Sequence, residues 1–302
     1  MTKRQDYWAN RLKSEMEHRI ELDAEMGKEY KRIYDLHQNN IEKEINNFIQ
    51  KYGSGEGLTQ AQVKKRVSEM DVQAFADKAT QYVKEKNFST KANEELKLYN
   101  LKMKISRLEL LQYHIDLEMV ALADGEYKLT GKYLDEAYIE ELRLQAGIMG
   151  EIVPDPATIR QSGQAIINTP YKGAVWSDSL WDRQDILRSI VADTAMDAVL
   201  EGKSALKVVP ALRKEFGVGE YQARRLAITE TARIQTAVQK ASYEANGFDM
   251  FDLIEEPTAC DDCKRIAREG PYYVKDMEPG KNAAPIHPFV IARLDHHLVA
   301  RS

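Results

Sequence analysis

Apolar residues recur at steps of three and four along the start of this chain, and that spacing constrains the fold most strongly. Between residues 3 and 51 the apolar positions include Trp8, Leu12, Met16, Ile20, Met26, Tyr30, Ile33, Ile41, Ile45 and Phe48. Because an α-helix turns once every 3.6 residues, these side chains fall on one face. The spacing predicts one long amphipathic helix, with a bend near Gly27 and an end at the glycines of 53–57.

Further helical patterns follow along the chain. Thr59 and Gln62 resemble a capping box that starts a short helix, and another helix is expected over 72–86. A second long helix should begin at Ser89 or Thr90 and end near Asp124-Gly125. The helices expected after it cover 133–147, 180–200, a short segment from Ser204, and 220–246, with a turn at 217–219. The long apolar stripes suit either an internal core or contacts with another subunit.

The last quarter of the chain predicts a different architecture. Residues 248–256 mix apolar and acidic side chains like a strand, and Tyr272-Tyr-Val-Lys275 is suited to pair with it. Charged residues make up 30% of the chain and aromatics 8%, a balance that favours helices over a β-sandwich. We therefore expect a mainly α fold of long amphipathic helices, followed by a small C-terminal α+β module.

Prolines and glycines mark the boundary between two regions. Residues 151–175 contain Pro154, Pro156, Gly163, Pro170 and Gly173, which predicts an extended linker. It would separate a helical arm region, 1–150, from a second domain, 176–302. No apolar run approaches the roughly 18 residues that cross a bilayer, and the N-terminus lacks the apolar core of a signal peptide. We expect a chain without a membrane segment, made in a reducing cytoplasm.

The two cysteines predict a metal site rather than a disulfide framework. Cys260 and Cys263 are the only cysteines, and they bracket Asp261-Asp262 at a spacing that lets two thiolates bind one ion. His287 is the natural third ligand, and His296 or His297 is a candidate for the fourth. We expect a zinc-knuckle-like turn with zinc bound by Cys260, Cys263 and His287, and two free thiols beside an ordinary histidine as the alternative.

Basic residues gather in the segment before Gly247, although the whole chain carries a net charge of −5. Such a patch can contact the phosphates of nucleic acid or an acidic partner, and its alternative is an ordinary solvated helix face. Trp176 and Trp181 are expected to be buried rather than to stack on bases. The candidate DNA-binding residues are Lys207, Arg213, Lys214, Arg224, Arg225, Arg233 and Lys240.

The order of motifs between residues 171 and 288 resembles the phage head morphogenesis family, the minor head proteins similar to protein F of phage Mu. The matching pieces are Tyr171-Lys-Gly-Ala-Val-Trp-Ser-Asp-Ser-Leu-Trp181, Ile228-Thr-Glu-Thr-Ala-Arg233, Tyr243-Glu-Ala-Asn-Gly247, Thr258-Ala-Cys-Asp-Asp-Cys263 and Pro285-Ile-His-Pro288. The family commonly closes with His-Pro-x-Cys-x-Cys. Here Phe289-Val-Ile-Ala-Arg293 follows the His-Pro, so the last two thiols of that pattern are absent.

The resemblance implies a virion component that is associated with the portal inside the head and is present in the host cytoplasm during assembly. It would act in head morphogenesis or genome delivery by binding portal protein, double-stranded DNA or itself, without catalysis. Other functions stay open from the residues. Asp295-His296-His297 with the two cysteines would suit a metal-dependent nuclease, and a toxin-like enzyme module is the other enzymatic alternative. The third alternative is a pure scaffold whose basic patch contacts only acidic protein.

Overall fold

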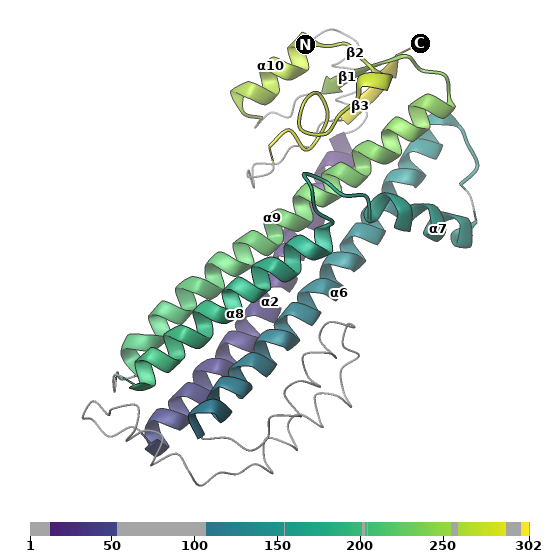
Figure 1. Ribbon diagram of the computed structural model, residues 1–302. Coiled ribbons are helices and arrows are strands. Elements are labelled where there is room, and N and C mark those ends of the chain that lie inside the picture. Colours follow the sequence, from purple (N-terminus) through teal and green to yellow (C-terminus); the bar gives the residue numbers. More distant parts are fainter. Residues whose placement is uncertain are drawn as a thin grey trace. The chain divides into compact units, whose positions relative to one another are not determined.

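The structure is a computed structural model that describes residues 13–52, 107–153, 155–200, 203, 205–254, 259–287 and 297–301. Within these ranges the chain is mostly helical, with a few strands confined to the C-terminal region (Figure 1). The expected mainly α fold with a small C-terminal α+β module is therefore confirmed. The helices expected over 59–70 and 72–86 lie outside the described residues. No helix in the described part is long and apolar enough to span a membrane.

Contacts between residues divide the chain into two compact units. Unit 1 comprises residues 1–28, 129–176 and 223–302, and unit 2 comprises residues 29–128 and 177–222. Three long helices contribute a segment to each unit: α2 (Lys13–Tyr52), α6 (Arg107–Met149) and α9 (Ala205–Ala245). Helix α8 (Trp176–Leu200) belongs almost wholly to unit 2, and α7 (Pro156–Ile167) belongs to unit 1.

The N-terminal stripe is buried as the spacing predicts. In α2, Tyr30, Tyr34, Ile41 and Ile45 are at most 1% exposed, so the face defined by steps of three and four is the face that packs. In unit 2 it packs against the other three helix segments. Tyr34 lies edge-on to Phe216 of α9 and donates a hydrogen bond to Glu126 of α6, at 2.7 Å. Arg183 of α8 pairs with the same buried carboxylate.

Two breaks that the sequence predicts are absent, because the helices continue through them. α6 runs through Asp124-Gly125, where Asp124 is 3% exposed and accepts from Lys128 of the next turn at 2.8 Å. α9 runs through the predicted turn at 217–219. Gly219 allows a close approach: a Cβ there would lie 2.8 Å from Leu187 and 3.0 Å from Tyr34. The glycine serves helix packing, and not a turn.

The predicted extended linker also contains a helix, α7. Asp155 caps it by accepting from the Thr158 backbone N–H at 3.2 Å and from the Thr158 hydroxyl at 2.6 Å. Pro156 occupies the first helical position, where its missing N–H costs no hydrogen bond. The expectation of an extended chain is therefore wrong for 156–167, since the Asp-Pro pair is a start signal that outweighs the turn-forming residues around it.

The C-terminal module is a three-stranded antiparallel sheet with one helix. Strand β1 (Met250–Ile254) pairs with β2 (Tyr272–Tyr273) on one side and with β3 (His297–Arg301) on the other. The first pairing confirms the predicted β-ribbon. Helix α10 (Asp261–Glu269) follows β1, and its buried residues Cys263, Ile266 and Ala267 join Phe251 and Val274 in one apolar core. This core positions the first two candidate metal ligands.

Candidate metal centre

Cys260 and Cys263 lie at the N-terminus of α10 rather than in an isolated turn. Cys260 precedes the helix with an extended backbone, and Cys263 lies in the first helical turn. The backbone N–H of Lys264 donates to the Cys260 carbonyl at 3.0 Å, which closes that turn. Residues three apart share a helix face, so the two sulfurs approach to 3.3 Å. The N-terminal end of a helix also favours negative charge, as on a thiolate.

His287 reaches the cysteines from a loop that α9 and the loop's own side chains hold in place. Thr236 of α9 donates its hydroxyl to the Ala284 carbonyl at 2.7 Å, and Lys240 donates to the Met277 carbonyl at 3.2 Å. A hydrogen bond within the loop also stabilises it, because the Asn282 side chain donates to the Asp276 carbonyl at 3.0 Å. These anchors were not predicted, since a lone Thr or Asn carries no sequence signal for such a role.

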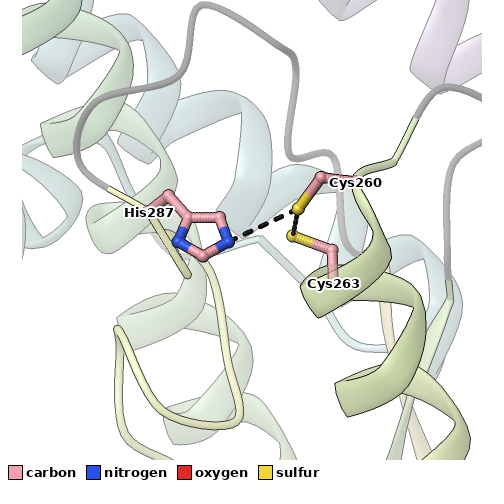
Figure 2. A group of neighbouring side chains, drawn as sticks. All are labelled: Cys260, Cys263 and His287. Atoms are coloured by element: carbon pink, nitrogen blue, oxygen red, sulfur yellow. Dashed lines mark hydrogen bonds between the residues drawn. The ribbon is translucent and has the colours of Figure 1, made fainter.

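The three side chains converge although the histidine is 24 residues beyond Cys263 in the sequence. The His287 Nε2 lies 3.4 Å from the Cys260 Sγ, and Figure 2 shows the imidazole edge directed at the two sulfurs. All three ligand atoms lie within 4.8 Å of one another. Among the described residues, no other group of three or more His, Cys, Asp or Glu side chains offers such an arrangement. The predicted trio is thus brought together, and it can hold a metal ion.

Burial differs among the three ligands and raises the pKa of one thiol. Cys263 is fully buried in the module core, whereas Cys260 and His287 are half-buried. Burial raises the pKa of Cys263 to about 12, and the neighbouring Cys260 adds to the shift. A bound cation would oppose both of these upward effects on the Cys263 pKa, because it stabilises two adjacent thiolates.

Neither candidate for the fourth ligand can be placed. His296 is outside the described residues, and only the backbone of His297 is described, at the start of β3.

The seven basic candidates all lie on α9, but they occupy different environments. Arg233 is 5% exposed, donates to Glu230 at 2.7 Å, and also donates to the Ile166 and Ile167 carbonyls at 3.1 and 3.0 Å. Arg233 therefore cannot contact a phosphate. Lys240 anchors the His287 loop, as described above. Arg224 and Arg225 are half-buried.

The remaining three candidates are exposed and belong to unit 2. Lys207 and Lys214 are exposed, and Arg213, 60% exposed, makes a double hydrogen bond to Glu42 at 2.9 and 3.0 Å. The candidates in unit 2 are therefore exposed, whereas the four in unit 1 are partly or fully buried. Trp176 is buried at 5% exposure, as predicted, and Trp181 stacks on Tyr127 with a ring-centre distance of 6.1 Å.

The motif residues of the C-terminal half hold the core of unit 1 together. Tyr243 is 2% exposed in the module core, and Gly247 ends α9 with a φ of +72°, a left-handed conformation that glycine adopts easily. Glu230 and Arg233 form the buried pair described above.

Searches of protein-family models, of curated proteins and of solved structures found no match to this chain.

Proposed function

We propose that this chain is a minor head protein of a tailed phage whose C-terminal module is stabilised by one zinc ion and which acts by binding. The observation that carries the proposal is the convergence of Cys260, Cys263 and His287. These are the thiol and imidazole positions of the ordered motifs that resemble the head morphogenesis family. Two thiolates and one imidazole form a donor set that suits zinc.

The observed distances fit a tetrahedral zinc site after small shifts. Bonds of about 2.3 Å to sulfur and 2.0–2.1 Å to nitrogen place ligand atoms about 3.5–3.8 Å apart. The sulfur–sulfur distance of 3.3 Å and the sulfur–nitrogen distance of 3.4 Å are only slightly shorter. The third pair of ligand atoms, from Cys263 and His287, lies within 4.8 Å, so the three residues are close enough to hold the ion. A role in stabilising the fold follows from the burial of Cys263 among Phe251, Ile266 and Val274.

Zinc content of the purified full chain tests the metal part of the proposal. We expect one zinc per chain by elemental analysis, and loss of that zinc in Cys263→Ser, which removes a buried thiolate ligand. Asp261→Asn is the matched control, because Asp261 lies between the cysteines in sequence but outside the cluster. A zinc-free native protein, or equal zinc in both variants, would exclude the site.

The long helices supply the binding surfaces in this proposal. Polar contacts to portal protein or to a second copy would use exposed helix faces, since the buried faces of α2, α6, α8 and α9 pack within the units. Pull-down of the portal protein of the same phage by the full chain, with and without nuclease treatment, tests this role. Capture that survives nuclease supports direct protein contact, and capture lost on nuclease treatment would assign the link to DNA.

DNA contact is proposed for fewer residues than the sequence suggests. Lys207 and Lys214, with Arg213 beside them, are the exposed candidates, so at most two or three phosphates are engaged. Affinity should then fall only about tenfold to fortyfold between 50 and 200 mM salt. Lys207→Glu with Lys214→Glu should weaken binding in a filter-binding or anisotropy assay, whereas Lys281→Glu, an exposed lysine of unit 1, should not. Salt-independent binding, or equal loss in both variants, would remove DNA from the proposal.

An enzymatic alternative is tested on the same preparation. Metal-dependent cleavage of plasmid DNA that disappears in Cys263→Ser would replace the binding proposal with a nuclease. No cleavage by the zinc-loaded chain is the result that the proposal expects.

A further inference from the structure

Unit 1 contains a cavity that the proposed binding role does not use, and the candidate metal ligand His287 is one of the residues that line it. It lies between the unit 1 segments of α2, α6 and α9 and the loop that ends at His287, and its volume is about 70 Å³. This exceeds what a single water molecule needs, so the cavity has room for a small organic group.

The cavity walls combine an apolar surface with carboxylates. Leu22 and Met26 of α2 and Ile228 of α9 supply apolar surface, and Asp23, Glu136 and Glu140 supply carboxylates. An aliphatic stem would therefore gain apolar contacts, while a positively charged end would meet acidic groups.

The one arginine in the lining pairs with carboxylates that lie outside it. The Arg19 guanidinium donates to the buried Glu141 at 2.6 Å and to Glu15 at 3.0 Å, so other carboxylates already hold it. Lys132 lies 4.0 Å from Glu136, with both side chains at least half exposed, and such a pair is weak in water. Arg19 therefore directs its hydrogen bonds to carboxylates other than Glu136 and Glu140.

Glu140 shows the effect of this environment. Burial raises its pKa, His18 lowers it, Glu15 and Glu136 raise it further, and Arg19 lowers it. Burial is the largest cause of this upward shift in pKa, so the ionised carboxylate is poorly solvated there. A cation placed in the cavity would favour the ionised form.

We propose that this cavity binds an alkyl ammonium group, with the ammonium at Glu140 and Glu136 and the aliphatic stem against Leu22, Met26 and Ile228. An unbranched four-carbon amine has five non-hydrogen atoms, and so does the side chain of lysine. The ligand is therefore either a free amine or a lysine of a partner protein. The proposal does not depend on the phage assignment.

Methyl NMR of the full chain labelled at methionine provides the test, because Met26 lines the cavity. The Met26→Leu variant assigns its signal among the ten methionines. We expect n-butylammonium to shift the Met26 methyl saturably, with a dissociation constant of about millimolar for so small a ligand. Butanol and butyrate match its stem but lack the positive charge, so each should bind at least tenfold more weakly.

Variants of the two carboxylates test whether they bind the ammonium group. Glu140→Gln and Glu136→Gln should each weaken n-butylammonium binding about fivefold or more, and Glu244→Gln, an exposed carboxylate on α9 outside the cavity, should leave it unchanged. Because Glu140 and Glu136 are replaced in separate variants, the test stays decisive if one variant disturbs folding, which the methyl spectrum reports directly.

A further comparison separates the two sources of the ligand. A capped peptide containing one lysine, and the same peptide with that lysine acetylated, are titrated alongside n-butylammonium. Tighter binding of the lysine peptide assigns the cavity to a partner's side chain, and binding of the free amine alone assigns it to a small molecule. No saturable Met26 shift, equal binding of butanol, or equal loss in Glu244→Gln would overturn the proposal.

Discussion

Arg233 is a charged residue that unit 1 uses for its own packing. Its guanidinium joins the Glu230 carboxylate and the last two carbonyls of α7, so one side chain links α9 to the C-terminal end of α7. The Ile166 carbonyl also accepts from the Thr169 backbone N–H at 3.2 Å, and a cation at this end of a helix interacts favourably with the helix dipole. The same Glu-x-x-Arg spacing on an exposed face would be a weak surface pair.

Replacing Arg233 should therefore destabilise the protein strongly. Arg233→Ala leaves Glu230 buried at 4% exposure without its partner, a loss of about 3–5 kcal/mol in the free energy of unfolding. Urea denaturation followed by circular dichroism measures it. Arg265→Ala is the control, since the pair that Arg265 forms with Glu269 is exposed. The midpoint of its urea unfolding should equal that of the native protein. Equal effects of the two variants would contradict the internal role of Arg233.

The proximity of the candidate metal ligands could be predicted at the residue scale, whereas the environments of the basic residues could not. Two cysteines three apart share one face whether they lie in a turn or at the start of a helix, so the proximity of Cys260 and Cys263 was predicted correctly. The burial of Arg233 depends on α7, a helix that the turn-forming residues of 151–175 conceal in the sequence. The link from Lys240 to the Met277 carbonyl likewise depends on the tertiary fold.

At the scale of elements, glycine was the least reliable signal. Gly125, Gly217 and Gly219 suggested breaks, but each lies inside a long helix. A helix interior tolerates a glycine at a cost of about 1 kcal/mol relative to alanine, and tertiary packing easily outweighs that cost. The apolar periodicity was more reliable, because it reports the buried face directly, as in the stripe from Tyr30 to Ile45.

Two glycines of α9 make a matched pair that tests its continuity. Gly217→Ala meets no atom within 4 Å and should stabilise the protein by up to about 1 kcal/mol. Gly219→Ala should instead destabilise it by about 1–3 kcal/mol, because the new methyl group overlaps Leu187 and the fully buried Tyr34 ring. Thermal denaturation of the two variants measures both. Destabilisation by Gly217→Ala would indicate the turn that the sequence suggested.

At the scale of the whole molecule, the cluster lies in only one of the two compact units. Cys260, Cys263 and His287 all belong to unit 1, where they join α10 to the loop that follows β2. Cys263 also belongs to the apolar core of the C-terminal module, so an ion bound by the cluster would link its binding to the folding of the module. Unit 2 contributes no ligand among its described residues.

Metal removal should therefore affect one part of the chain selectively. Treatment of the zinc-loaded protein with a chelator should speed amide hydrogen exchange in 250–254 and 259–287, because local unfolding of the module becomes easier. The unit 2 segments of α2 and α8 should exchange at an unchanged rate. Cys263→Ser should show the fast pattern with or without chelator. Uniform acceleration over both units would contradict a local role for the metal.

X-ray absorption at the zinc edge tests the central claim, that Cys260, Cys263 and His287 together bind one zinc ion. The native chain should show two sulfur neighbours at about 2.3 Å and an imidazole nitrogen at about 2.0–2.1 Å. In His287→Ala the imidazole scattering should disappear while both sulfurs remain. A first shell without sulfur, or an imidazole signal that survives in His287→Ala, would contradict the claim.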